Sequence, residues 1–128
     1  MIYLDSSVVL AHVLSETRRP PAELWAHALI SSRLLEYEVW TQIHARKLGP
    51  THSAVARSVT DRLAFLELIP EIVSRAREPI PAAIRTLDAL HLASCIFLVN
   101  QGQDIELATF DTRMIEAAKK LKLPLFRL

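Results

Sequence analysis

Three aspartates each stand where an apolar run gives way to a polar or helix-starting stretch. Asp5 follows the apolar segment Ile2–Leu4, Asp111 follows Leu107–Phe110, and Asp88 lies at the start of a long apolar helical pattern. In an open parallel sheet, the carboxyl ends of the strands and the adjoining helix N-termini converge on one crevice, where ligands bind. Three carboxylates in one crevice repel each other unless a cation or shared protons neutralise them. The pattern therefore predicts a divalent metal site and a hydrolytic or phosphoryl-transfer function.

A fourth carboxylate is expected from the helical segment that begins near Leu34. Glu36 and Glu38 both lie in its first turns. Positions two apart on a helix point in nearly opposite directions, so only one of the two can face the crevice. Because apolar residues surround this helix on almost all sides, its pattern does not select between them. Glu36 and Glu38 are therefore both alternatives at this point.

Each aspartate also has a purely structural interpretation. Asp5 and Asp111 precede helical segments and are suitable N-caps, and Asp88 suits the positive end of its helix. Taken together at converging ends, the three favour a site over three separate caps. Ser6 and Thr109 lie beside the strand-end aspartates, where they can hydrogen-bond the carboxylates or a scissile phosphate, or act as ordinary caps and turn formers.

Two arginines and one histidine lie close to these aspartates in the sequence. Arg85 and Arg113 flank Asp88 and Asp111, and they are candidate phosphate contacts because guanidinium pairs bidentately with phosphate oxygens. Alternatively, they hold the acidic cluster together when no metal is bound. His91 lies one turn after Asp88, where a packed or hydrogen-bonded role is favoured over that of a general base. The other histidines lack ligand spacing, so zinc is not expected.

Composition places limits on the class of protein. The chain has 128 residues, of which 51% are hydrophobic, and a formal net charge of +1. These values predict one folded domain over residues 1–128, and the near-neutral charge does not by itself indicate nucleic-acid binding. The single cysteine, Cys95, lies in an apolar run and is expected in the core without a disulfide. Because neither a signal peptide nor an apolar run of membrane length is recognisable, we expect a cytoplasmic protein with no membrane contact.

Short apolar runs alternate with longer helical patterns, which is typical of βαβ units and predicts an α/β fold with a parallel sheet. Ser6 or Ser7 is expected to cap the first helix. The pair Gly49-Pro50 is expected to end the helix that precedes this pair. Strands are expected at Ile2–Leu4, Leu29–Ser32, Leu66–Ile69, Ile105–Thr109 and, as an edge strand, Pro124–Phe126. Helices are expected at Val8–Leu14, Ala22–Ala28, Leu34–Lys47, Thr51–Phe65, Glu71–Arg77, from the Asp88 region to Asn100, and at Thr112–Leu121.

Four segments of the chain together resemble the PIN domain family, and more closely the VapC-type toxin ribonucleases of bacterial toxin–antitoxin pairs. The segments are Tyr3–Val8, Ser32–Val39, Arg85–Ser94 and Ala108–Ala118, in the order and spacing of the family. The Arg85–Ser94 segment, with its Asp-Ala-Leu-His-Leu-Ala motif, is the most specific of the four. The likeness spans the whole chain.

The resemblance implies a single PIN-like domain over residues 1–128, with a parallel sheet of about four to five strands between helices (α/β/α). It implies a metal-dependent endoribonuclease that uses Mg²⁺, with Mn²⁺ as a substitute. The glutamate of the family falls about six residues after a serine, which from Ser32 selects Glu38 over Glu36. The family often carries an arginine three residues later, where this chain has Thr41. The implied catalytic and metal-binding quartet is Asp5, Glu38, Asp88 and Asp111.

The ligand set and the resemblance also lead to expectations about ions and partners. Carboxylate oxygens suit Mg²⁺ or Mn²⁺, and we expect Asp5 and Asp88 to hold the principal ion, with Glu38 and Asp111 acting through water or on a second ion. The resemblance implies an RNA substrate, a small antitoxin as partner and a homodimer. The first helices carry many apolar residues, which either form a groove for an amphipathic helix of the partner or pack as ordinary core; they are Leu10, Val13, Leu14, Leu24 and Trp25.

Three other classes compete with the nuclease. A phosphatase of the haloacid dehalogenase type requires a second aspartate two residues after the first, where this chain has Ser7. A receiver-like domain requires an acidic pair after the first strand, where Ser6 and Ser7 stand. A catalytically inactive module with the same fold would only bind a partner. An ion that binds the native state must stabilise it, so metal titration separates this module from the nuclease.

Overall fold

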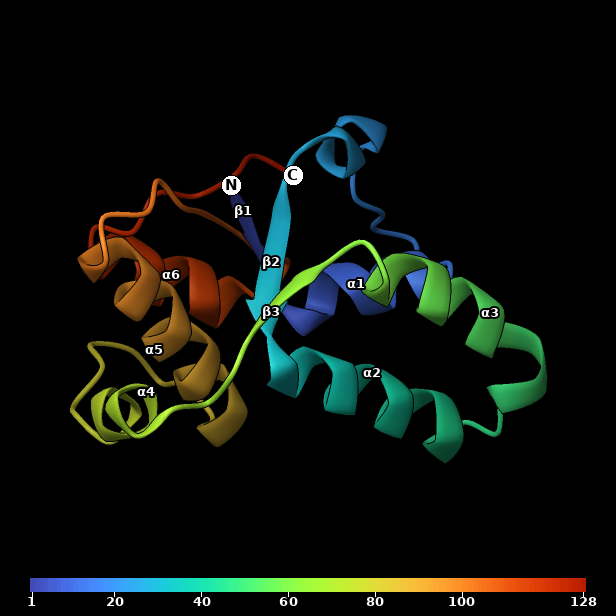
Figure 1. Cartoon of the computed structure of the whole chain (residues 1–128), viewed down its shortest axis with the longest axis horizontal. Helices are drawn as coiled ribbons and strands as arrows, with labels where there is room; N and C mark the ends of the chain where they lie inside the picture. The colour runs from blue at the N-terminus through green and yellow to red at the C-terminus, as the bar shows by residue number, and fades with distance from the viewer.

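The computed structural model describes all 128 residues and contains one sheet of four parallel strands (Figure 1). The order of the strands in the sheet is β3-β2-β1-β4. In the central strand, Tyr3 pairs with Ile30 on one side and with Leu107 on the other. The strands are β1 (Ile2–Leu4), β2 (Leu29–Ser32), β3 (Ala64–Leu66) and β4 (Glu106–Ala108).

Helices cover both faces of this sheet, which confirms the expected α/β/α architecture. Figure 1 shows α1, α2 and α3 on one side of the strands and α4, α5 and α6 on the other. None of the helices combines the length and the apolarity that crossing a bilayer requires. The helices are α1 (Ser6–Val13), the 3-10 helix η1 (Ala22–Ala26), α2 (Arg33–Ala45), α3 (Gly49–Thr60), α4 (Pro70–Ala76), α5 (Thr86–Asn100) and α6 (Thr112–Lys120).

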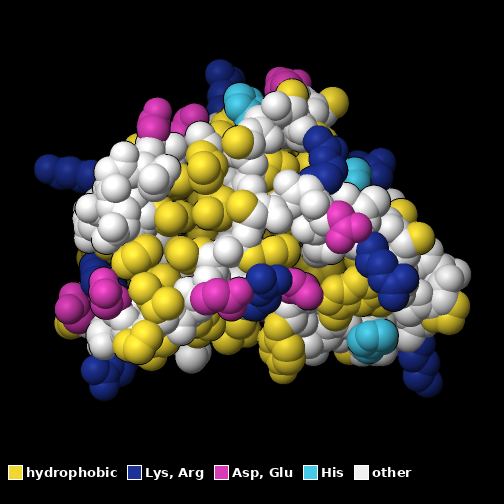
Figure 2. Space-filling model, viewed as in Figure 1, with side chains coloured by type: hydrophobic (Ala, Val, Ile, Leu, Met, Phe, Trp, Pro, Cys, Tyr) yellow, Lys and Arg dark blue, Asp and Glu magenta, His cyan; other side chains and the backbone are white.

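The two faces of the sheet carry two separate cores, because successive side chains of a strand point to opposite faces. Ile2 and Leu4 of β1 pack in the core formed with α1, α2 and α3. Tyr3, between them, packs in the core formed with α5 and α6, where Cys95 is also buried. Figure 2 shows hydrophobic side chains gathered over the β3, α4 and α5 part of one face of the molecule, with most Lys and Arg side chains near its outline.

The expectation for the segment around Gly49 was wrong in one respect. Gly49 and Pro50 open α3 instead of ending the helix before it, since proline at the first helical positions gives up an N–H that has no partner there anyway. Helix α3 ends at Thr60, so the expected helix Thr51–Phe65 was too long. The strand follows at Ala64–Leu66 instead of Leu66–Ile69, and it pairs with Ile30–Ser32.

Two smaller expectations also need correction. The predicted edge strand Pro124–Phe126 forms only one bridge, between Leu107 and Leu125, because Pro124 has no N–H to extend the ladder. The N-cap of α1 is Asp5, not Ser6 or Ser7: the Asp5 side chain accepts from the backbone N–H of Ser7. The same carboxylate that was predicted for the site therefore also begins the helix.

The order of the strands decides where the site lies. The chain leaves β1 through α1 to reach β2 on one side, whereas β4 lies on the other side of β1. The order therefore reverses between β1 and β4, and ligands of open α/β sheets bind beside the carboxyl ends of strands at such a point. Asp5 follows β1 there, and Thr109 and Asp111 follow β4.

Candidate active site

Asp5 is held at the end of β1 through one of its two carboxylate oxygens. Its Oδ2 accepts hydrogen bonds from the hydroxyls of Ser7 at 2.7 Å and Thr109 at 2.9 Å. Its Oδ1 is buried and has no hydrogen-bond partner. A buried acceptor without a partner is costly, and a cation in contact with it removes that cost. Asp5 is therefore oriented by its neighbours and retains one oxygen for a ligand.

Asp111 caps α6 and is tied to Asp5 through Thr109. Its Oδ1 accepts the backbone N–H of Arg113 at 2.8 Å, and its own backbone N–H donates to Thr109 Oγ1 at 3.0 Å. Because the Thr109 hydroxyl donates in turn to Asp5, one threonine fixes the spacing of two carboxylates. Arg113 contributes only this backbone contact, and its guanidinium forms no ion pair.

Asp88, in the first turn of α5, is buried beside the other two aspartates. Burial, followed by the negative charge of Asp5, raises the pKa of Asp88, and Asp111 adds to this effect. The Arg85 guanidinium opposes it by lying 3.3 Å from Asp88 Oδ2 and 3.4 Å from Asp111 Oδ2. Arg85 thus supplies positive charge between two carboxylates that repel each other, one of the two roles expected for it.

Glu38 joins the aspartates, whereas Glu36 does not. The Ser6 hydroxyl donates to Glu38 Oε2 at 3.1 Å, and His91 Nε2 lies 2.5 Å from Glu38 Oε1. Glu36 instead pairs at 2.9 Å with Arg33 on the surface. The periodicity of the helix left Glu36 and Glu38 as alternatives. The structure places Glu38, and not Glu36, in the same pocket as the aspartates.

A buried chain of hydrogen bonds runs behind Glu38. The Tyr3 hydroxyl lies 2.7 Å from His91 Nδ1 and accepts the backbone N–H of Ser32 at 3.2 Å. A carboxylate can only accept, so the proton between His91 and Glu38 resides on Nε2. Burial lowers the pKa of His91, but the hydrogen bond to Glu38 and the charges of the surrounding carboxylates outweigh it and raise the pKa. His91 is therefore a hydrogen-bonded partner of Glu38, as its position after Asp88 suggested.

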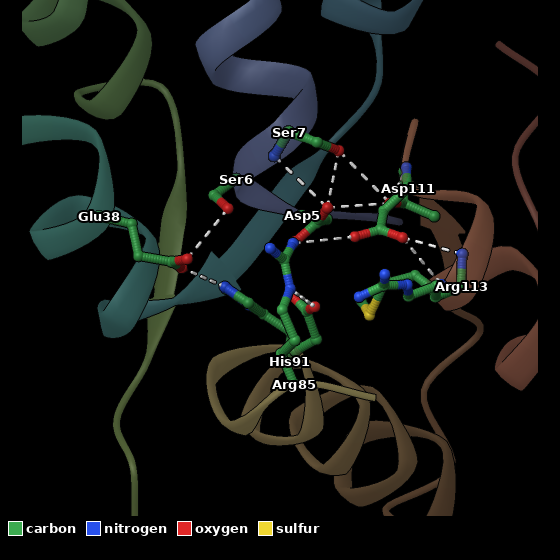
Figure 3. A network of polar contacts seen from close by, with 11 residues as sticks. Asp5, Ser6, Ser7, Glu38, Arg85, His91, Asp111 and Arg113 are labelled. Carbon is green, nitrogen blue, oxygen red and sulfur yellow. Dashed lines mark hydrogen bonds and ion pairs between the residues drawn. The ribbon is translucent and has the colours of Figure 1, made fainter. Parts of the chain in front are cut away.

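All four predicted carboxylates line one pocket of about 520 Å³. Figure 3 shows Asp5, Glu38, Asp111 and Arg85 directed toward a common centre from four different elements. Thr41, at the position where the family often has an arginine, is also part of the wall. The remaining lining residues are Ser6, Ser7, Gln42 and Thr86, with Leu10, Tyr37 and Leu87.

The donor set of this pocket fits a hard divalent cation. The acidic residues that line it provide carboxylate oxygens, the ligand type that Mg²⁺ and Mn²⁺ prefer. Among these oxygens, Asp5 Oδ1 has no hydrogen-bond partner. No three His, Cys, Asp or Glu side chains are close enough to form a complete ligand set; Arg85 instead bridges Asp88 and Asp111. An ion that used Oδ2 of Asp88 or of Asp111 would displace Arg85 from that oxygen, and the 70% exposure of the Arg85 side chain permits this movement.

Sequence reasoning missed two residues of this network. The sequence indicates Ser7 only as a helix cap, but its hydroxyl donates to Asp5 and accepts the backbone N–H of Phe110 at 3.0 Å. The sequence indicates Tyr3 only as a strand residue, although its hydroxyl contacts His91, which is 88 residues away in the sequence. A tyrosine on the buried face of a strand is the one available signal, because a buried hydroxyl needs a partner.

A model of the PIN domain family matches residues 2–120 of the chain. The chain belongs to the PIN domain family. This PIN domain protein is 32% identical to Ribonuclease VapC46 of Mycobacterium tuberculosis (strain ATCC 25618 / H37Rv) over 94% of its own length and 92% of the relative's. It is 31% identical to Ribonuclease VapC35 of the same species, over 96% and 93% of the two chains.

The fold of this PIN domain protein is also that of a solved structure. The crystal structure of Mycobacterium tuberculosis VapC20, described as a sarcin-ricin loop cleaving toxin, superimposes with a TM-score of 0.69. The two chains are 20% identical, and the match covers 91% of this chain and 95% of the other. Both the family expected from the four sequence segments and the α/β/α fold are therefore confirmed.

Proposed function

We propose that this PIN domain protein is a metal-dependent endoribonuclease and the toxin of a toxin–antitoxin pair. The observation that carries the proposal is the convergence of Asp5, Glu38, Asp88 and Asp111 on one pocket, with Asp5 Oδ1 buried and unpartnered. The relatives, which match this chain over more than nine-tenths of their length and are named ribonucleases, support the same reaction. Family membership removes the phosphatase and receiver alternatives.

The proposed cofactor is Mg²⁺, for which Mn²⁺ can substitute. Asp5 and Asp88 would hold the principal ion, and Glu38 and Asp111 would act through water or on a second ion. When bound, such an ion acidifies a water molecule and offsets the charge that develops on a phosphate. The oxygen donors of the pocket and the raised pKa of Asp88, caused by burial and by Asp5, fit a site that gains from a cation.

The other side chains of the pocket hold the carboxylates in place. Ser7 and Thr109 fix Oδ2 of Asp5, and Ser6 and His91 fix the two oxygens of Glu38. In this arrangement Glu38 keeps spare lone pairs. They can accept a hydrogen bond from an attacking water molecule, orient it and take up its proton.

Arg85, being exposed, is the proposed contact to the scissile phosphate. Arg113 is a second proposed contact, from the exposed first turn of α6. The two differ in their present partners, since Arg85 pairs with Asp88 and Asp111 and the Arg113 guanidinium pairs with neither. A phosphate that takes up Arg85 therefore competes with these carboxylates.

The antitoxin and the homodimer are predictions that follow from the proposed toxin role. Most of the apolar side chains considered for a partner groove belong to the core: Val13 and Leu24 are buried, and Leu10 and Trp25 pack against them. Among the apolar residues of the pocket wall, Tyr37 and Leu87 are exposed. We place the protein in the cytoplasm with its RNA substrate. Co-expression with the candidate antitoxin, followed by light scattering, tests for the complex with the antitoxin and for the homodimer.

The decisive experiment incubates the purified, partner-free protein with a structured RNA pool in Mg²⁺, Mn²⁺ or chelator, beside an Asp5→Asn variant. Cleavage that needs the metal and is lost in the variant is the expected result. Cleavage that survives both the chelator and the Asp5→Asn substitution would show that a contaminant cuts the RNA, and the experiment would then contradict the proposal. No cleavage and no thermal stabilisation by either metal would favour the partner-binding module instead.

A further inference from the structure

A second hollow, of about 660 Å³, is lined in part by Thr109 and Phe110, which precede Asp111 in the chain. Its charged side chains are all cationic, whereas the carboxylate pocket has four acidic side chains and one arginine. Such a concentration of positive charge contrasts with the formal net charge of +1 of the whole chain. We call the four cations the cationic track; they are Arg18, Arg19, Lys119 and Arg127.

The cationic track is continuous with the carboxylate pocket. A smaller hollow of about 300 Å³ lies between them. It shares Ser7 and Asp111 with the carboxylate pocket, and it shares Arg18, Phe110 and Thr112 with the cationic hollow. A ligand that extends from the carboxylates past Phe110 therefore reaches the four cations without leaving the concave surface.

The cations of the track are free to bind an anion. None of the four forms an ion pair, although the neighbouring Lys120 pairs with Glu116 at 3.1 Å. Arg18 is held in place without being neutralised: its guanidinium lies 5.2 Å above the Phe110 ring and donates to the Phe110 carbonyl at 3.1 Å. A guanidinium that is positioned by an aromatic face and a carbonyl keeps its remaining donors for phosphate.

We propose that the cationic track binds the backbone phosphates of the RNA strand on one side of the scissile bond. The proposal rests on the proposed nuclease function, which places one phosphate at the carboxylates. The next phosphates of the strand then follow the concave surface past Arg18 toward Arg19, Lys119 and Arg127. Contacts of this kind position the strand and do not read its sequence.

The test compares a variant of the track with a variant of equal charge change elsewhere. The track variant is Lys119→Gln with Arg127→Gln, and the control is Lys120→Gln with Arg77→Gln; all four side chains are exposed. Affinity for a labelled single-stranded RNA of mixed sequence is measured by fluorescence anisotropy at several salt concentrations. Each lost phosphate contact should reduce the slope of log affinity against log salt by about 0.7. We expect the track variant to bind roughly tenfold more weakly, and the control to bind within about twofold of wild type.

Cleavage measured on the same variants separates the two proposals. We expect the track variant to raise KM several-fold at unchanged kcat, and Arg18→Lys, which keeps the charge, to retain the salt slope of wild type. Unchanged affinity and salt slope in the track variant would overturn the track and leave the nuclease intact. Binding that depends on the track in a protein that never cleaves RNA would overturn the nuclease. A track variant that keeps RNA binding but loses binding to poly-glutamate would show a site for an acidic protein and overturn the proposal.

Discussion

The imidazole Nε2 of His91 donates to Oε1 of Glu38 across 2.5 Å, and this contact joins a fully buried ring to a carboxylate of the pocket. The other ring nitrogen is in contact with the Tyr3 hydroxyl at 2.7 Å. The orientation of Glu38 is therefore determined from the middle of β1, inside the core between the sheet and α5 and α6. Carboxylates at metal sites commonly owe their geometry to such outer partners.

Removing only the hydroxyl of Tyr3 should expose this dependence. Tyr3→Phe leaves His91 Nδ1 and the Ser32 N–H without their buried partner, which should cost about 1–3 kcal/mol of unfolding free energy. Cleavage should fall by about tenfold, because the orientation of Glu38 is loosened. Urea unfolding and initial rates measure the two effects. Tyr37→Phe makes the same chemical change on a side chain that is 66% exposed and should leave stability unchanged; equal losses in both variants would contradict the expectation.

Glu36 and Glu38 offer a matched pair two residues apart on α2. Glu38→Gln removes a carboxylate from the pocket and should reduce cleavage by more than about 100-fold. Glu36→Gln removes a surface ion pair with Arg33, which is worth little in solvent, and should leave the rate unchanged. Initial rates in Mg²⁺ compare the two. A larger loss in Glu36→Gln would mean that the wrong glutamate has been placed in the site.

Asp88→Asn should stabilise the protein in chelator while abolishing cleavage. The carboxylate of Asp88 is buried and repelled by Asp5 and Asp111, which together raise its pKa, so neutralising it relieves an unfavourable charge. We expect the Tm in chelator to rise by a few degrees. We also expect Mg²⁺ to raise the Tm of wild type further and to have no such effect on Asp88→Asn. Differential scanning fluorimetry measures both. The exposed Asp104→Asn is the control, and a lower Tm for Asp88→Asn in chelator would refute the prediction.

Cys95 should make stability fall at alkaline pH. Burial, and then the negative charge of Asp5, raises the pKa of its thiol well above the ordinary value. Above the ordinary thiol pKa the unfolded chain loses a proton that the folded chain keeps, so the native state is favoured less as pH rises, by up to about 1.4 kcal/mol per pH unit. The stability lost in Cys95→Ala relative to wild type should therefore shrink between about pH 8 and 9.5, as measured by urea unfolding. A difference that is constant with pH would contradict this.

The positions of the aspartates followed from local pattern because each stands at the end of a strand or the start of a helix. The carboxyl ends of parallel strands meet at one edge, so Asp5 and Asp111 could be brought together without any knowledge of their contacts. The same pattern failed between Leu63 and Ile69, where apolar residues allow several strand registers and pairing with β2 selects Ala64–Leu66. Glu38 could be chosen from the family resemblance but not from periodicity.

Contacts between distant side chains were beyond local pattern. The link from Tyr3 to His91, and the bridge by Arg85 between Asp88 and Asp111, depend on how α5 packs on the sheet. The continuity of the cationic track depends on Arg18 in the loop after α1 meeting Phe110 after β4. Loop geometry of this kind has no periodic signal in a sequence.

The four carboxylates come from four separate elements: the end of β1, the first turns of α2, the first turn of α5 and the start of α6. Since Asp111 follows β4, which pairs with β1 at the edge of the sheet, the fourth carboxylate takes its place only after the chain through α6 has been made. During synthesis, a partial chain that ends before α6 has neither Asp111 nor the Thr109 hydroxyl that fixes Asp5. A ribosome that makes this protein therefore carries no assembled carboxylate cluster until α6 has emerged and docked.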